Sequence, residues 1–403
     1  MRLLFITNNF PNPMQPTRGT FNFEMAKAFV AEGHTIEVVA PVSWWDEQQL
    51  KRQGRFDPSR EAVVAGIRTH YPRYFYPPKI LRSWYGYFMW HSVRQKVLSI
   101  LGQSPPDVVL AYWAHPDGYA ALQAARQIGC PLVVIVGGSD VLVLCKNAAR
   151  RRCVVEVLTA ADMVLTVGRD LQAKIAALGI PPEKIRVGYR GVDTLHFHPG
   201  DRATARQRLG LPQDGRLALW VGRMEHVKGL DTLLEACEIL KTMGVAFSLA
   251  LVGSGLLEPV LRKQCTALGV QEQVRFVGSV LHKDLPDWYR AANATVLPSL
   301  SEGVPNVLLE SIATGIPFVA SDVGGIPEIA TEGVDRLVPP ADPQALADAL
   351  ESIFRLPPSQ APRTFQPPSR SDSAQEFIRL IETHCQRKAL VRLPSCKGGA
   401  LVS

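Results

Sequence analysis

A pair of basic residues follows a predicted strand in the second half of the chain. The strand Leu217–Val221 runs into the segment GRMEHVKG, which places Arg223 at the carboxyl end of the strand and Lys228 at the start of a helix. A helix dipole opposes a cation at its amino end unless an anion is shared there, and an arginine can direct two hydrogen bonds onto that anion. The segment therefore predicts a diphosphate site, with two solvated bases on a loop as the plainer alternative.

Two glutamates enclose the segment EGVPNVLLE. Because Pro305 suits the first position of a helix and Gly315 its exit, Glu302 is predicted to lie in a loop and Glu310 about two turns into the helix. Glu310 has apolar neighbours in the sequence, where an unpaired carboxylate is costly. It therefore needs a hydrogen-bonding partner, which could be the hydroxyls of a sugar or ribose, or a neighbouring arginine.

Weaker signals follow other predicted strands. The segment DVGGIPE follows the strand Pro317–Ala320, and its paired glycines allow a ligand to approach the backbone but also suit an ordinary turn. In the first half, the loop NNFPNPMQPTRGT ends at Gly19, WAHPDG contains His115 and Asp117, and GGSD follows a third strand. A lone histidine is more often structural, but His115 and Asp117 lie together at a strand end, so one of them is a candidate site residue.

Short β-branched runs alternate with helical stretches along the chain, which is typical of βα units on parallel sheets. In the first half, the predicted strands are Leu3–Thr7, Ile36–Ala40, Val63–His70, Val108–Ala111, Leu132–Val136, Met163–Val167 and Ile185–Val187. The helices predicted between them include Phe21–Glu32, Gly118–Ile128 and Asp170–Leu178. In the second half, the strands after the first are Ser248–Val252, Val274–Val277, Ala294–Leu297 and Pro317–Ala320.

A chain of 403 residues suits two domains, since domains commonly hold about 100–200 residues. We predict an α/β protein with a first doubly wound domain over residues 1–190, a linker over 191–215 and a second domain over 216–356. Residues 357–403 are predicted to form a Pro/Ser-rich connector, a last helix over 374–386 and a disordered tail. Ligands of such sheets bind outside the carboxyl ends of the strands, which predicts one crevice between the domains.

Composition and cysteine usage exclude several classes of protein. With 46% hydrophobic residues and a mean hydropathy of +0.03, the chain is an ordinary globular protein. No apolar run approaches the roughly 18 to 20 residues that span a bilayer, and the first residues do not resemble a secretory signal. The seven cysteines include no C-x-x-C pair, which argues against disulfides and zinc and favours the reducing cytoplasm.

Positive charge gathers in the first half. Residues 1–190 hold 23 Lys and Arg against 14 Asp and Glu, a net charge of +9, whereas residues 191–403 hold 21 against 23, a net charge of −2. No acidic residue lies between Glu61 and Asp107, and nine of the twenty residues from Tyr71 to Trp90 are aromatic. This stretch is either an aromatic part of the core with solvated bases or a surface that faces anionic lipid or an anionic acceptor. No nucleic-acid-binding motif accompanies the charge, so we predict no nucleic acid partner.

The segments GRMEHVKG, EGVPNVLLE and GGIPE resemble those of glycosyltransferase family 4, and the resemblance extends over roughly residues 1 to 350. The segments HPDGYAA and GGSD look most like those of bacterial members that build surface polysaccharides. The resemblance implies the GT-B fold, in which two Rossmann-like doubly wound domains face each other across a crevice. It also implies an enzyme that transfers a sugar from a nucleotide-sugar with retention of anomeric configuration, through a front-face route in which the departing phosphate helps to deprotonate the acceptor.

The same resemblance assigns roles to residues of the second half. Arg223 and Lys228 would bind the donor diphosphate, and Glu310 would bind the ribose. The transferred sugar would be held by Glu302, Gly303, Val304 and Asn306.

In the first half, the resemblance implies that Gly19 lets the donor phosphate approach the first domain. The family's site histidine in this domain aligns with His115, or the alignment falls on Asp117, and the sequence leaves both open. At the hinge, Arg190-Gly191-Val192-Asp193 departs from the family's usual Asn-Gly-Val-Asp.

No Asp-x-Asp motif occurs, so neither a metal nor another cofactor is expected. The expected partners are a nucleotide-sugar, a glycan or lipid-linked acceptor, and an anionic membrane surface that would hold the protein at the inner face of the membrane. Three alternatives share the fold, namely a sugar phosphorylase, a nucleotide-sugar epimerase and a non-catalytic sugar-nucleotide-binding protein. A dinucleotide oxidoreductase is the weakest alternative, because the first βα turn lacks G-x-G-x-x-G.

Overall fold

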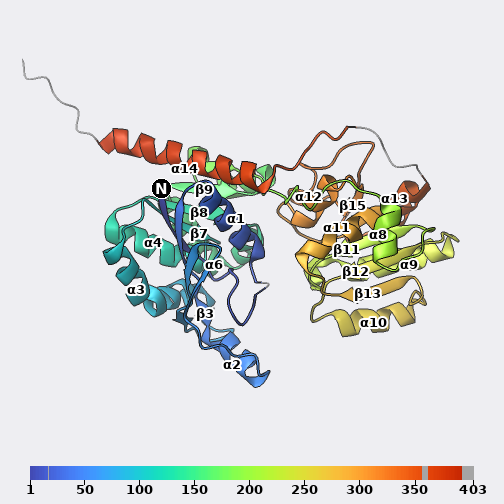
Figure 1. Cartoon of the computed structure of the whole chain (residues 1–403), viewed down its shortest axis with the longest axis horizontal. Coiled ribbons are helices and arrows are strands. Elements are labelled where there is room, and N and C mark those ends of the chain that lie inside the picture. Colours follow the sequence, from blue (N-terminus) through green and yellow to red (C-terminus); the bar gives the residue numbers. More distant parts are fainter. Residues whose placement is uncertain (17, 356–361, 393–403) are drawn as a thin grey trace, which may run out of the picture. The chain divides into compact units, whose positions relative to one another are not determined.

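The computed structural model describes residues 1–16, 18–355 and 362–392, apart from the side chains of 385–392. The chain divides into two units, each with a parallel sheet and helices (Figure 1). Unit 1 comprises Met1–Thr166, Ile175–Gly188 and the chain from Ser371 on, and unit 2 comprises Val167–Lys174 and Tyr189–Arg370. The predicted fold class of two doubly wound α/β domains is confirmed.

The sheet of unit 1 has eight strands in the order β10-β9-β8-β7-β1-β2-β5-β4. Their bounds are β1 Arg2–Ile6, β2 Thr35–Val39, β4 Glu61–Val64, β5 Ile67–His70, β7 Val108–Tyr112, β8 Leu132–Val136, β9 Met163–Thr166 and β10 Ile185–Val187. All neighbours are parallel except β4 and β5. The single predicted strand Val63–His70 is therefore wrong: Ala65 and Gly66 both have positive φ, which closes a tight hairpin turn.

Helices cover both faces of this sheet. The helices of unit 1 are α1 Thr20–Ala31, α2 Trp44–Arg52, α3 Tyr85–Gln103, α4 Asp117–Ile128, α5 Ser139–Leu142, α6 Ala148–Ala160 and α14 Arg370–Arg392, with short 3₁₀ turns η1 Arg82–Trp84, η2 Leu144–Lys146 and η3 Pro182–Lys184. The helix α7 Arg169–Ala177 is divided between the two units, with its residues up to Lys174 in unit 2. A small sheet pairs β3 Val42–Ser43 with β6 Arg73–Tyr74. On one face, α1 and α14 pack on alternate residues of the strands, such as Leu3 and Phe5. On the other face, α4 contacts β1, β7 and β8 and lies beside α3 and α6.

The sheet of unit 2 has six parallel strands in the order β13-β12-β11-β14-β15-β16. Their bounds are β11 Leu217–Val221, β12 Ser248–Val252, β13 Val274–Gly278, β14 Ala294–Leu297, β15 Phe318–Ser321 and β16 Arg336–Val338. The helices are α8 Arg202–Arg208, α9 Leu230–Thr242, α10 Glu258–Ala267, α11 Leu285–Ala291, α12 Asn306–Ala313 and α13 Pro343–Arg355, with 3₁₀ turns η4 His226–Lys228 and η5 His282–Asp284. Three predicted strands of this unit, β11, β12 and β14, have the predicted bounds.

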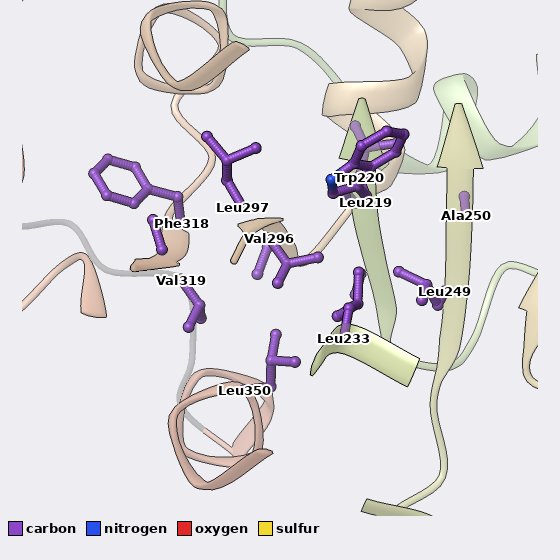
Figure 2. Close-up of a cluster of buried hydrophobic side chains, with 14 of the residues drawn as sticks. Leu219, Trp220, Leu233, Leu249, Ala250, Val296, Leu297, Phe318, Val319 and Leu350 are labelled. Atoms are coloured by element: carbon purple, nitrogen blue, oxygen red, sulfur yellow. The ribbon is translucent and has the colours of Figure 1, made fainter. Parts of the chain in front are cut away.

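The core of unit 2 lies between the sheet and its helices. Figure 2 shows Leu233 of α9, Val296 of β14 and Leu350 of α13 pointing toward one another. All three are at most 1% exposed. This packing fixes the strands whose carboxyl ends carry the candidate site.

The predicted linker forms part of unit 2, and the last helix differs from its predicted bounds. Residues 191–215 belong to unit 2 and include α8, where the Asp201 side chain accepts a hydrogen bond from the Thr204 amide. The last helix is longer than the predicted 374–386, and its residues from Ser371 on pack in unit 1, where it appears in red in Figure 1. The predicted disordered tail lies largely outside the described residues. None of the helices in the described ranges combines the length and the apolarity that a bilayer span requires.

Each sheet has one point at which the strand order reverses, and such points are where doubly wound sheets bind ligands. In unit 1, β1 lies between β2 and β7, so the reversal falls between β1 and β7. In unit 2, β11 lies between β12 and β14, so it falls between β11 and β14. The loops that follow these four strands contain most of the predicted site residues.

Candidate functional site

The loops after β11 and β14 meet through an ion pair. Lys228 Nζ lies 2.6 Å from Glu302 Oε1, and the Ser299 hydroxyl donates to the same oxygen at 2.8 Å. The Lys228 and Glu302 side chains are only 23% and 11% exposed. The structure thus brings together a base and a carboxylate that the sequence had linked only by resemblance. Ser299 was not predicted, although it lies two residues after β14, where a polar residue could have been noted.

Glycines allow these loops to approach one another. Gly229 has a φ of +61°, and a Cβ there would lie 2.0 Å from the Pro298 carbonyl oxygen. Gly324 has a φ of +58°, and a Cβ there would lie 2.0 Å from the Glu302 carbonyl oxygen. Larger side chains at either position would displace the backbone around the Lys228–Glu302 pair. Gly324 therefore holds the loop after β15 against this site.

Arg223 contributes an unburied guanidinium at the carboxyl end of β11. Its side chain is 81% exposed, and Nη1 lies 3.0 Å from Glu225 Oε1. Such an exposed pair stabilises the fold little, so Arg223 is available to an incoming anion. Lys228 ends η4 and precedes α9, which begins at Leu230. Both bases thus lie near the amino end of α9, close to where the sequence predicted them.

Glu310 has two partners, neither of which is the arginine considered from the sequence. Glu310 Oε1 lies 3.0 Å from His282 Nε2, and Oε2 accepts a hydrogen bond of 2.8 Å from the Tyr289 hydroxyl. Burial and the Glu310 charge raise the pKa of Tyr289 well above its usual value, so this hydroxyl remains a donor. Each carboxylate oxygen can accept more than one hydrogen bond, so capacity remains for ribose hydroxyls.

The helix that carries Glu310 begins later than predicted. Pro305 is the N-cap and α12 starts at Asn306, one residue later than predicted. Glu310 is four residues further along, so it lies about one turn into the helix, and the predicted two turns are wrong. Gly315 lies just after the end of α12 and has a φ of +78°, the left-handed conformation that suits a glycine at a helix C-terminus. Its predicted place at the end of the helix is confirmed. His282 and Tyr289 could not be predicted as partners, because they come from η5 and α11.

The three further predicted sugar-holding residues differ in what they offer. The Gly303 carbonyl accepts the Gly325 amide at 2.9 Å, which fixes the turn before α12. Val304 is 5% exposed and packs in the core, so its side chain is turned away from solvent. Asn306 Oδ1 is buried and has no hydrogen-bond partner within the described part of the chain. Asn306 is therefore the member of the set with unused polar capacity.

In unit 1, Asp117 joins the loops after β1 and β7. Its Oδ1 accepts a hydrogen bond from the Asn8 amide, while its buried Oδ2 has no partner among the described residues. Burial raises the pKa of Asp117 to about 7, although the Asn8 amide opposes this shift. A carboxyl group with an unused oxygen lies where the strand order reverses.

His115 is buried in the same loop but has a different role. Its Nε2 accepts a hydrogen bond of 3.2 Å from the Gly86 amide, near the start of α3. Burial, followed by the charge of Arg150, lowers the pKa of His115 to about 4, although the backbone of Ser83 acts in the opposite direction and raises it. His115 is therefore neutral near pH 7 and satisfies a helix amide, which is the structural role common for a lone histidine.

Two other first-half segments also hold these loops together. In GGSD, Asp140 accepts hydrogen bonds from the Ala114 amide at 3.2 Å and the Gly138 amide at 2.9 Å. Gly19 is the N-cap of α1 with a φ of +58°, and a Cβ there would lie 2.0 Å from the Asn9 carbonyl oxygen. Gly19 is thus required by the packing of its own loop, whatever approaches it from solvent.

Glu328, the last residue of GGIPE, binds the start of α7 within unit 2. Its carboxylate accepts hydrogen bonds from the Arg169 amide at 2.7 Å, the Asp170 amide at 2.6 Å and the Tyr189 hydroxyl at 2.8 Å. A carboxylate suits the amino end of a helix. The sequence identified the segment GGIPE but gave no role to its glutamate.

No cluster of three or more His, Cys, Asp or Glu side chains that could hold a metal ion occurs among the described residues.

Comparisons with known protein families match both halves of the chain. The family described as "Glycosyltransferase Family 4" matches residues 19–195, and that described as "Glycosyl transferases group 1" matches residues 201–365. TuaC of Bacillus subtilis strain 168, named as a glycosyltransferase of teichuronic acid biosynthesis, is 28% identical over 362 residues. The alignment spans 87% of this chain and 88% of TuaC. The matches together favour sugar transfer over the phosphorylase, epimerase, non-catalytic and oxidoreductase alternatives.

Solved structures share the fold of the whole chain. Sucrose-phosphate synthase from Thermosynechococcus elongatus has a TM-score of 0.73 at 20% identity, and 97% of each chain is covered. HepE of Anabaena, solved in complex with UDP-glucose, has a TM-score of 0.67 at 20% identity, with 97% of this chain and 99% of HepE covered.

Proposed function

The chain belongs to glycosyltransferase family 4, and we propose that it transfers a sugar from a UDP-sugar, with retention and without a metal ion, to a lipid-linked glycan in polysaccharide biosynthesis. The observation that carries the proposal is the Lys228–Glu302 pair at the strand reversal of unit 2, with Arg223 in the loop after β11 and Glu310 in α12. These four side chains offer two cations for a diphosphate and two carboxylates for hydroxyls.

The donor nucleotide is proposed to bind along the ends of β11 and β14. Arg223 and Lys228 neutralise the diphosphate. Glu310 accepts hydrogen bonds from the ribose, and His282 and Tyr289 hold the Glu310 carboxylate in place. UDP is the nucleotide proposed for the first test, since HepE, which shares the fold, was solved with UDP-glucose. The roles of Arg223, Lys228 and Glu310 in donor binding are part of this proposal.

In the proposed reaction the bond between the donor sugar and the phosphate breaks, and the acceptor hydroxyl bonds to the same face of the sugar carbon. The hydroxyl proton passes to the departing phosphate, whose charge Arg223 and Lys228 stabilise without a metal ion. Glu302 holds the transferred sugar with Gly303, Val304 and Asn306. The proposal gives Glu302 a holding role: Lys228 and Ser299 fix its Oε1, which leaves Oε2 to accept hydrogen bonds from the hydroxyls of the sugar.

We propose Asp117, rather than His115, as the residue of unit 1 that orients the acceptor. Each residue has one buried polar atom without a partner among the described residues, Asp117 Oδ2 and His115 Nδ1, but only Asp117 is bonded to the loop after β1, through the Asn8 amide, whereas His115 Nε2 accepts the Gly86 amide of α3. The acceptor is proposed to be a lipid-linked glycan at the inner face of the membrane, and the name of TuaC, which refers to teichuronic acid biosynthesis, supports a role in glycan synthesis.

The experiment that tests the donor site is isothermal calorimetry with UDP and uridine, both in EDTA. We expect Arg223→Ala and Lys228→Ala to weaken UDP binding on the order of tenfold or more while uridine binding stays nearly unchanged, because only UDP carries the diphosphate. Lys263→Ala, an exposed lysine of α10, is the matched control and should behave as wild type. Equal losses for UDP and uridine would refute the diphosphate assignment.

The same titrations separate the two glutamates. Glu302→Gln should keep or strengthen UDP binding, since it releases the charge of Lys228, yet abolish transfer from a UDP-sugar. Glu310→Gln should weaken UDP binding through lost ribose contacts. A folded Glu310→Gln protein with normal UDP affinity would contradict the ribose assignment, and NMR of the product anomer would test retention.

A further inference from the structure

Unit 1 exposes large apolar side chains around η1. Ile80, Leu81 and Trp84 are 60%, 55% and 54% exposed, and Tyr87 of α3 is 42% exposed. The Trp84 and Tyr87 rings lie edge to face with centroids 5.7 Å apart. Soluble proteins rarely leave such a group of neighbouring large apolar side chains in water unless it meets a partner. The aromatic-core interpretation of this stretch holds for buried Tyr74 but not for Trp84 and Tyr87.

Unpaired bases surround these side chains. The bases are Lys79 and Arg82 beside the apolar group, Lys146 of η2, and Arg150, Arg151 and Arg152 in the first turn and a half of α6. Within the described part of the chain, none of the six forms an ion pair with a carboxylate. One exposed carboxylate, Glu156 of α6, lies near them, since its charge acts on the Cys153 thiol, so the six bases leave this surface with a net positive charge.

Two contacts show that the apolar and basic groups form one surface. The Cys153 thiol of α6 lies 3.3 Å from the Ser83 carbonyl oxygen of η1, and α6 also packs against η2. Arg82 and Arg150 are close enough that the charge of Arg82 lowers the pKa of Arg150, after burial as the larger cause. Positive charge in the first turn of α6 also opposes the dipole of that helix. The fold tolerates this repulsion, which an external anion would relieve.

We propose that this basic and apolar surface of unit 1 docks on anionic phospholipid membranes. The phosphate groups of the lipids neutralise the six bases, while Ile80, Leu81, Trp84 and Tyr87 enter the interface between headgroups and acyl chains. Trp and Tyr suit that interface, because each has an apolar ring and one polar group. The positive charge favours an anionic membrane over an apolar protein partner as the occupant.

The surface is joined to the candidate acceptor residues of unit 1. Trp84 precedes α3, and the Gly86 amide in the first turn of α3 donates to His115, two residues before Asp117. A lipid-linked acceptor held at this surface would therefore present its glycan near the loops after β1 and β7. Docking itself goes beyond the proposed reaction, since vesicle binding requires no sugar transfer.

The test is co-sedimentation of the full chain with two kinds of vesicle, one of phosphatidylcholine alone and one of phosphatidylcholine with phosphatidylglycerol, at low and high salt. Wild type should bind only the anionic vesicles, and high salt should release it. A triple variant with Arg82→Gln, Arg151→Gln and Arg152→Gln should bind the anionic vesicles on the order of a hundredfold more weakly, because each base contributes about a fivefold factor. Arg68→Gln, Arg216→Gln and Lys263→Gln remove the same charge from exposed sites elsewhere and should have little effect.

A second variant tests the apolar part of the surface. Ile80→Ser, Leu81→Asn and Trp84→Ser together should also weaken binding, with asparagine chosen because Leu81 has a positive φ of 49°. Wild type that ignores anionic vesicles at low salt, or equal losses in the basic variant and its control, would overturn the proposal. If wild type forms dimers and does not bind vesicles, and if the apolar variant is monomeric, the surface binds a second copy of the chain. That result would also overturn the proposal. Either failure would leave the UDP titrations unaffected, so docking and sugar transfer fail separately.

Discussion

Asp117 and Asp140 are buried carboxyl groups with raised pKa values in neighbouring loops of unit 1. Burial raises the pKa of Asp117 to about 7 and that of Asp140 to about 6, although backbone amides donate to both. The unfolded chain releases these protons near pH 4, before the folded protein does. Ionisation therefore disfavours the folded state, and the free energy of unfolding should fall as pH rises from about 4 toward 7, by about 1.4 kcal/mol per unit of pKa difference.

We expect Asp117→Asn to remove this pH dependence while its side-chain oxygen still accepts the Asn8 amide. The stability of the variant relative to wild type should grow from about pH 4 and level off near pH 7. For Asp140→Asn, the matched comparison, the gain should level off near pH 6. Urea unfolding at several pH values measures both, and taking the difference between variant and wild type cancels the opposing effect of His115. If the difference in stability between Asp117→Asn and wild type does not change with pH, the pKa of Asp117 is not raised by folding and the prediction is wrong.

At the scale of elements, the last helix is part of unit 1 although the first 188 residues supply nearly all the rest of it. Phe377 and Ile381 of α14 are 4% and 0% exposed and lie in the same core as β1 and α1. A Cβ on Gly188, at the end of the β10 segment, would lie 2.3 Å from the Phe377 ring. The helix thus closes one face of the sheet that holds the candidate acceptor residues.

This packing predicts that Phe377→Ala destabilises unit 1 by about 3–5 kcal/mol, the usual cost of removing a buried phenylalanine. Arg379→Ala, at an exposed position two residues later, should change stability by less than about 0.5 kcal/mol. Hydrogen exchange of the β1 and β8 amides reports on unit 1 directly. Wild-type protection in Phe377→Ala would mean that unit 1 does not depend on α14.

At the scale of the whole molecule, each unit has its own core and the proposed donor residues all belong to unit 2. We therefore expect UDP at about 100 times its dissociation constant to stabilise unit 2 by about 2.7 kcal/mol and to leave unit 1 nearly unchanged. Hydrogen exchange in β11 and β14, compared with β1 and β8, measures the two effects. Equal gains in both units would show that the chain unfolds as one cooperative body.

The sequence by itself determined the βα alternation, the two-unit fold and the family. Continuous β-branched runs such as Leu132–Val136 predicted strand bounds correctly, because a buried parallel strand needs apolar residues on both faces. Motif spacing likewise located the loops around Lys228 and Glu302, since such loops lie next to strand ends in the sequence itself.

Only the tertiary structure decided which side chains meet. The partners of Glu310 are His282 and Tyr289, which come from other elements, and neither local periodicity nor charge pattern specifies such a contact. The same holds for the hairpin at Ala65, the helix that starts at Asn306, and the placement of α14. Periodicity reports which face of an element is buried, whereas the partner of that face depends on packing between segments far apart in the chain.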